Sequence, residues 1–262
     1  MKVHRNFAFL LASAALVWAQ NPPSGRAGFG AGPRFLGAEA GMPGRVVKGA
    51  PFSGDLVTES TQTLADGNRI RQTTTVHLVR DSDGRTRREE SLAGLGALAT
   101  GGGAQQVIFI NDPVAGANYA LDPAHKTANK SGWVASRSGE RPFGPGQTTR
   151  QMRSGGSMKA EPLAAATIEG IPAQGTRFTV TIPAGAIGNE ATIQIVTERW
   201  YSPELQMNVL TRRSDPRTGE TVTRLTNVSR SEPPSTLFQV PPDFKVIERP
   251  VPRFRPSAPT SQ

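Results

Sequence analysis

The sequence predicts a mainly β protein, a twisted antiparallel meander or half-barrel with few helices. Thr- and Val-rich runs recur between short turn signals, and residues 177–182 alternate polar and apolar with the period of a strand. Helical periodicity is scarce. The chain contains no cysteine, so this sheet must be held by burial and hydrogen bonds rather than by disulfides.

The first block of strands begins near Val46. Residues 55–64 and 68–80 are strand-like runs joined through Asp66-Gly67, and an Asp-Gly step supplies the positive φ angles of a tight hairpin turn. A second hairpin is expected at Asp83-Gly84. The apolar run at 107–110 predicts a strand buried on both faces. Further strands of this block are expected over residues 85–91, 119–121 and 126–130.

The second block has the clearest strand pattern. Phe178, Val180 and Ile182 alternate with polar residues, which predicts one buried face. Other strands are expected over residues 193–201, 207–214 and 220–230. The best helical candidates are residues 89–99 and a single turn at 161–167. Successive strands with short turns favour the meander over any layered α/β arrangement.

The first 19 residues have the order of an export signal. Lys2, His4 and Arg5 form a basic start, residues 7–16 are apolar, and cleavage is expected after Ala19. A retained membrane anchor is the alternative, although a span needs ~20 apolar residues. We therefore expect a periplasmic or secreted protein.

Composition divides the rest of the chain into three parts. Residues 20–45 are Gly/Pro-rich and predict a disordered tether, and the Pro/Arg-rich residues 249–262 predict a disordered tail. Between them, residues 46–248 predict a single antiparallel β domain. Its Gly-rich segments near 94–105 and 132–160 are expected to be long loops.

The charge is basic, with a formal net charge of +9 carried mostly by arginine. A solvated basic sheet face is the simplest interpretation. Arginine also binds carboxylate and phosphate, so anionic lipid head groups or acidic polysaccharide are the anionic partners expected outside the cytoplasm. Nucleic acid is not expected as a partner, because the export signal places the chain outside the cytoplasm. The two Tyr and three Trp are also too few for a base-stacking platform.

No motif assembles a catalytic or metal site. The run Asp81 to Gly84 resembles a calcium loop, but an acidic position is missing and arginines crowd it, so a hairpin turn is favoured. Beyond the leader the only histidines are His77 and His125, too few for a zinc site without carboxylates. No Gly-x-Ser-x-Gly elbow is present. The sequence thus predicts no catalytic residue, no metal and no cofactor.

Three segments carry a resemblance to known proteins: WYSPEL at 200–205, SDPRTGET at 214–221 and FQVPPD at 238–243. With them the chain resembles a group of exported bacterial proteins of unknown function. More distantly, it is similar to the outer-membrane lipoprotein-carrier (LolA-like) superfamily. The pattern covers roughly residues 46–247, with motif similarity only over 193–247. The resemblance implies a curled antiparallel sheet whose concave face holds an acyl chain or another apolar ligand.

The ligand-binding residues we expect are Trp200, Tyr201, Phe178 and Phe109. Trp200 and Tyr201 are adjacent on a predicted strand and should point to opposite faces, and simple core packing is the competing interpretation. The sequence therefore predicts a non-catalytic envelope binding module for a lipid or other apolar ligand. The alternative is an adaptor for an envelope protein or anionic surface polymer, and a hydrolase with an unrecognised site ranks below both. No disulfide-linked partner is expected.

Overall fold

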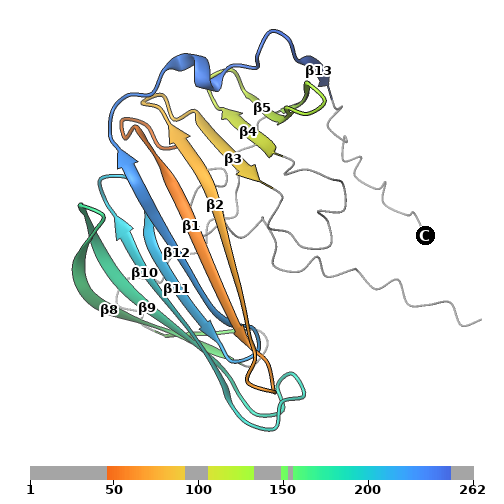
Figure 1. The fold of residues 1–262 in the computed structure, drawn as a ribbon. Coiled ribbons are helices and arrows are strands. Elements are labelled where there is room, and N and C mark those ends of the chain that lie inside the picture. The colour runs from red at the N-terminus through yellow and green to blue at the C-terminus, as the bar shows by residue number, and fades with distance from the viewer. Residues whose placement is uncertain (1–45, 92–105, 133–148, 153–155, 249–262) are drawn as a thin grey trace, which may run out of the picture. The chain divides into compact units, whose positions relative to one another are not determined.

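The computed structural model describes residues 46–91, 106–132, 149–152 and 156–248. Within these ranges, thirteen strands form one open sheet (Figure 1). The predicted mainly β fold is confirmed, and no helix in the described ranges is long and apolar enough to cross a membrane. The expected leader, tether and tail lie outside the described residues.

The elements are, in chain order, β1 (Phe52–Thr63), β2 (Arg69–Arg80), β3 (Thr86–Ser91), β4 (Gln106–Asp112), β5 (Ala117–Asp122), β6 (Thr127–Gly132), β7 (Thr149–Gln151), β8 (Ser157–Ile168), β9 (Ile171–Ile182), β10 (Ile193–Ser202), β11 (Met207–Asp215), β12 (Gly219–Ser229), the 3-10 helix η3 (Ser235–Phe238) and β13 (Lys245–Glu248). Across the sheet their order is β13-β6-β5-β4-β3-β2-β1-β12-β11-β10-β9-β8-β7.

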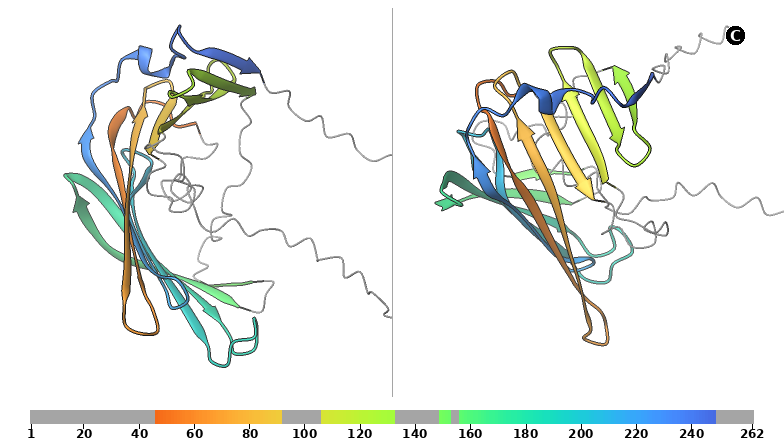
Figure 2. Two further views of the ribbon diagram at one scale, coloured as in Figure 1. Left: turned by 45° about the vertical axis from the view of Figure 1, so that its right-hand side comes forward. Right: turned by 45° about the horizontal axis from the view of Figure 1, so that its top comes forward.

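Two antiparallel meanders, β1 to β6 and β7 to β12, are joined because β1 pairs with β12. The sheet is curled, as the two views of Figure 2 show, and its edge strands β13 and β7 are not joined to each other. At one edge β13 runs parallel to β6, which a simple meander did not predict. A half-barrel thus describes the sheet better than a closed barrel.

Both predicted Asp-Gly hairpins are confirmed. Gly67 has a φ of +83° and Gly84 a φ of +86°, a region that favours glycine. The turn between β2 and β3 is also crowded, because a Cβ on Gly84 would lie 2.7 Å from Cγ1 of Val46. These two positions fix the register of β1 with β2 and of β2 with β3.

The pairing of β1 with β2 and β12 defines two faces of the sheet. Leu56 lies between Val76 and Leu225, whereas Val57 lies between Thr75 and Arg224. Because successive side chains of a strand point to opposite sides, we call these the Leu56 face and the Val57 face. On β1, β2 and β12 the members of one hydrophobic core cluster lie on the Leu56 face, and on β2 and β4 the members of the other lie on the Val57 face.

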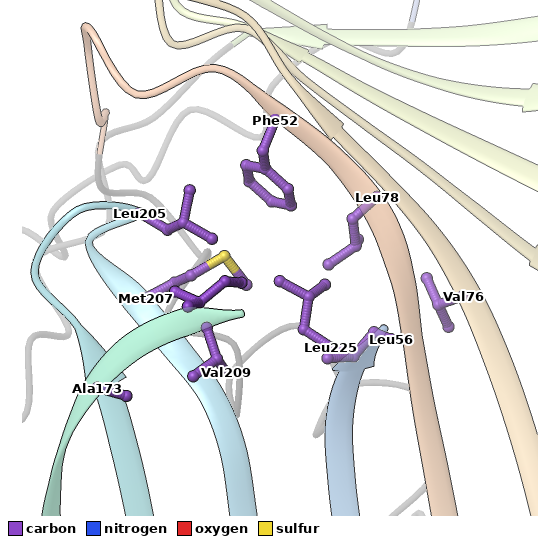
Figure 3. Packing of buried hydrophobic residues seen from close by; sticks show 10 residues of the cluster. Phe52, Leu56, Val76, Leu78, Ala173, Leu205, Met207, Val209 and Leu225 are labelled. Carbon is purple, nitrogen blue, oxygen red and sulfur yellow. The ribbon is translucent and has the colours of Figure 1, made fainter. Parts of the chain in front are cut away.

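Cluster 1 lies on the Leu56 face of β1, β2 and β12 (Figure 3). Arg80 packs against one end of cluster 1. The Arg80 Cζ lies 4.8 Å from the Phe52 ring centroid, and Arg80 Nη2 donates to the carbonyl of Leu205 at 2.5 Å. The guanidinium is thereby buried with partners rather than alone. The members of cluster 1 are Phe52, Leu56, Val76, Leu78, Ile171, Ala173, Leu205, Met207, Val209 and Leu225.

Cluster 2 lies on the Val57 face and is covered by the segment after β12. Phe238 of η3 is only 3% exposed there, and Arg87 Nη1 donates to the Leu237 carbonyl at 3.0 Å. The cluster consists of Val79, Ile108, Ile110, Leu121, Ala128 and Phe238, with Tyr119, Leu237, Val240 and Phe244 packed against it. This explains the FQVPPD motif as a structural cover.

Several details of the sequence prediction need correction. The helical turn expected at 161–167 is wrong, because these residues belong to β8 and pair with β9. Alanine favours helices, yet strand pairing overrides that weak preference here. The first three residues of the other helical candidate, 89–91, lie in β3, and 92–99 lie outside the described residues. β8 also begins at Ser157, inside the segment expected to be a loop.

Candidate functional site

The Leu56 face continues past cluster 1 as a band of threonines. Thr58 pairs with Thr223, and Thr223 with Thr211, across three neighbouring strands. All three are buried, and the hydroxyls of Thr58 and Thr223 are 3.1 Å apart. Their polar atoms lie on the same face as the apolar cluster, so this side of the sheet is amphipathic.

Beyond the threonine band, the Leu56 face becomes apolar again on β8, β9 and β10. Phe178, Thr197, Arg213, Thr221 and Ser60 form one row across the sheet. The next row places Met158, Val180 and Ile195 side by side. Ile195 is buried, whereas Met158, Phe178, Val180, Ile182 and Ile193 are half-buried.

This apolar stripe belongs to neither core cluster. The alternation of Phe178, Val180 and Ile182 predicted a buried face, but the buried residues of β9 are Ile171, Ala173 and Gly175, which lie at the other end of the strand and on its opposite side. Among the residues that the structure describes, the stripe is therefore a half-buried apolar surface outside the two clusters.

The opposite end of the same face carries the other predicted phenylalanine. Phe109 pairs with Arg88, and Arg88 with Leu78, which puts Phe109 on the Leu56 face. The Arg88 Cζ lies 4.6 Å from the Phe109 ring centroid, and Arg199 stands over Phe178 in the same way at 5.2 Å. An arginine thus stacks on a half-buried phenylalanine at both ends, a favourable cation–π arrangement.

Arg88 also forms an ion pair within its own strand. Its Nε lies 2.9 Å from Glu90 Oε1, and the Glu90 side chain is 6% exposed. Burial lowers the pKa of Arg88, and Glu90 opposes this shift. Burial likewise raises the pKa of Glu90, against the opposing effect of Arg88. Desolvation therefore outweighs the attraction between the two charges.

The other two predicted residues lie elsewhere. Trp200 packs against cluster 1, and Tyr201 is half-buried beside it, with a register shift between the two. A Cβ on Gly175 would lie 3.0 Å from Trp200 Nε1, so the indole sits directly over that glycine. The structure brings Phe109 and Phe178 onto one face and places Trp200 as a packing aromatic.

The WYSPEL and SDPRTGET motifs form structural turns. Ser202 accepts a hydrogen bond from the Leu205 amide at 3.2 Å, and Leu205 enters cluster 1. Asp215 accepts two hydrogen bonds from the Arg217 guanidinium, at 2.9 and 2.8 Å. The pKa of Asp215 is lowered to about 2, and the hydrogen bond from the Arg217 side chain is the largest cause. These contacts account for both motifs without a ligand.

The histidines and the acidic turn have local partners. His77 is paired with Asp55 at 2.8 Å and His125 with Asp122 at 2.7 Å. Asp81 Oδ1 accepts from the amide of Arg85 at 2.8 Å, as expected for the favoured hairpin turn. Within the described ranges, no group of three or more His, Cys, Asp or Glu could hold a metal ion.

Sequence reasoning did not select Arg88 and Glu90 as a binding pair. Their spacing could have indicated the pair, because two residues that are two positions apart on a strand point to the same face. That Phe109 is the cross-strand neighbour of Arg88 depends on the register of β3 with β4. No short turn sets this register, because residues 92–105 separate the two strands.

The chain matches no protein-family profile and no curated protein sequence. Among solved structures, a chain of the Pseudomonas aeruginosa MucA/MucB complex is 14% identical, with a TM-score of 0.39, over 76% of this chain and 59% of that chain. This chain thus spans less than two thirds of that protein.

Two further structures are similar at the same low level. An uncharacterized conserved protein from Thermus thermophilus is 9% identical, with a TM-score of 0.37, over 76% of this chain and 91% of that chain. A putative outer membrane lipoprotein-sorting protein domain from Vibrio parahaemolyticus is 8% identical, with a TM-score of 0.27, over 72% and 89%. These values are too low to transfer a function.

Proposed function

We propose that this protein is a non-catalytic binding module of the cell envelope that holds an apolar or amphiphilic ligand against its Leu56 face. The observation that carries the proposal is the half-buried apolar stripe of Phe178, Val180 and Ile182, together with Met158 and Ile193. A contiguous apolar surface that a protein leaves outside its core is typical of a ligand or partner site.

The size of the hydrophobic effect favours an acyl chain as the ligand. Each methylene buried from water contributes ~0.8 kcal/mol, so about ten buried methylenes would contribute ~8 kcal/mol. Association costs at least ~4 kcal/mol in lost freedom. A single chain lying along the stripe would therefore be held reversibly, as a carrier or sensor requires.

The buried threonines beside the stripe support the same conclusion. Thr197 lies next to Phe178 in one row and is 7% exposed. Hydroxyl groups at the border of an apolar surface orient a ligand that has both apolar and polar parts. The Leu56 face therefore suits an amphiphile better than a purely apolar molecule.

The competing function is an adaptor for an envelope protein or anionic polymer that uses the Val57 face. Arg212 and Arg224 are exposed there, but acidic residues alternate with the basic ones, as in the Arg177–Glu198 pair at 2.7 Å. A face of mixed charge binds polyanions weakly. Salt-sensitive binding to anionic envelope polymer, lost near 1 M salt where the Debye length is ~3 Å, would favour the adaptor.

Uptake of a fluorescent fatty acid by the full chain tests the proposal. Val180→Gln puts a polar group in the stripe and should weaken uptake at least about fivefold, because it removes apolar contact area. Thr179→Gln is the matched control, since Thr179 is the neighbouring residue on the Val57 face. Equal uptake by both variants, or no uptake by the unmodified chain, would rule out the stripe as the site.

A further inference from the structure

The buried pair of Arg88 and Glu90 lies in an apolar part of the Leu56 face. On β2, Leu78 pairs with Arg88 and Val76 with Glu90. On β4, Phe109 pairs with Arg88 and Val107 with Glu90. Two charges are thus surrounded laterally by four apolar side chains, an arrangement that costs free energy unless all their polar atoms have partners.

The polar atoms of this pair are not fully partnered. Arg88 Nε and Glu90 Oε1 are both buried, and although 2.9 Å apart they do not form a hydrogen bond with each other or with another described residue. The Arg88 side chain is nevertheless 25% exposed, so a ligand can reach it. Unsatisfied buried polar groups are rare in native proteins and often mark a functional site.

We propose that Arg88 binds the carboxylate of a single-chain amphiphile whose acyl chain begins against Phe109 and Val107. This inference rests on the proposed function, because it places a ligand on the same Leu56 face, at the β3–β4 end of that face rather than on the stripe of β8 to β10. The guanidinium is planar and offers paired N–H donors, which match the two oxygens of a carboxylate. The half-buried Phe109 ring that Arg88 covers offers the adjoining apolar surface.

A singly charged head group fits this place better than a phosphate. Glu90 stays beside the guanidinium, and its charge would repel a dianion more strongly than a monoanion. Glu90 is the neighbouring anion of Arg88, so it competes with an incoming carboxylate. The two residues therefore have opposite predicted effects on affinity, which a merely structural ion pair would not show.

The experiment measures palmitate binding by calorimetry to the full chain, with hexadecanol as the uncharged probe. Arg88→Gln should weaken palmitate binding about tenfold or more, since hydrogen bonds to a charged group are strong. Glu90→Gln should tighten it severalfold by removing the competing carboxylate. Neither variant should change hexadecanol binding by more than about twofold.

Two controls keep the result clear. The double variant with Arg88→Gln and Glu90→Gln leaves no unpaired buried charge, so it should fold and bind palmitate as weakly as Arg88→Gln alone. The cross-strand pair of Arg177 and Glu198 lies on the Val57 face, and Arg177→Gln should leave palmitate affinity unchanged. Thermal unfolding of each variant confirms that the folded protein is compared.

The outcomes separate this inference from the proposed function. If palmitate and hexadecanol bind equally well and Arg88→Gln changes neither, the head-group site is wrong while the apolar site stands. If Glu90→Gln weakens palmitate binding as much as Arg88→Gln does, the pair is structural and the inference is again wrong. If neither probe binds the unmodified chain, both proposals fail.

Discussion

Asp215 should stabilise the fold in a pH-dependent way, because its buried carboxylate is paired with two arginines. Its side chain is 2% exposed and lies 2.8 Å from Arg217 Nη2 and 3.3 Å from Arg213 Nη2. These partners lower the pKa of Asp215 from 3.8 to about 2. At ~1.4 kcal/mol per pKa unit, the full shift would correspond to ~2.5 kcal/mol of stability. Because both arginines are more than a third exposed, solvent screening reduces this to ~1–2 kcal/mol.

The sign of the pH dependence follows from the depressed pKa of the folded state. Well above pH 3.8 the carboxylate is ionised in both states and its stabilisation is fully present. As the pH falls from 3.8 to about 2, the unfolded chain takes up the proton first and the stabilisation is lost. The difference in unfolding free energy between the unmodified chain and Asp215→Asn should therefore shrink over this interval.

Urea denaturation of both proteins at pH 7, 5, 3 and 2 measures that difference. We expect ~1–2 kcal/mol at pH 7 and 5 and a value near zero at pH 2. Arg217→Gln should reproduce part of the loss at neutral pH and show the same trend. A difference that stays constant from pH 7 to pH 2 would refute the assignment of this stability to the ionised carboxylate.

Three further substitutions test the packing. Leu225 is fully buried in cluster 1, so Leu225→Ala should cost ~2–5 kcal/mol in unfolding free energy. Val246→Ala at a 47% exposed site should change the unfolding free energy by less than ~0.5 kcal/mol. Equal effects of the two substitutions would contradict the burial of Leu225. Gly175→Ala places a Cβ 2.8 Å from the Leu163 Cβ and 3.0 Å from Trp200 Nε1, and it should cost ~1–3 kcal/mol in unfolding free energy. The tryptophan fluorescence should also shift, because Trp200 must move. An unchanged spectrum would count against the contact between Gly175 and Trp200. Phe238→Ala should cost ~3–5 kcal/mol in a denaturant titration, and a loss below ~1 kcal/mol would show that η3 does not cover cluster 2.

Local turn chemistry made much of the fold predictable. The Asp66-Gly67 and Asp83-Gly84 steps marked two hairpins, because both glycines need positive φ angles. The hairpin between β8 and β9 turns at Glu169 and Gly170 with φ values of +49° and +76°. That Glu-Gly step was not recognised, and the alanines before it favoured a helix. Pairing with β9 decides this segment, and tertiary pairing is not visible in local propensity.

The site was predicted less well, for a physical reason. Phe109 and Phe178 share one face only because β1 pairs with β12 across more than 160 residues, as between Thr58 and Thr223. Periodicity assigns a residue to one side of its own strand, but it does not say which sides of distant strands coincide. The same limit hid the contact between Arg88 and Phe109.

Native mass spectrometry of the full chain, purified without detergent and paired with lipid extraction of the same sample, tests the central claim most directly. If the Leu56 face holds a ligand, we expect a reproducible added mass that matches an acyl lipid. Val180→Gln should then lose this mass and Thr179→Gln should keep it. A bare polypeptide mass for the unmodified chain, together with no uptake of added fatty acid, would contradict a ligand on the Leu56 face and favour the adaptor function.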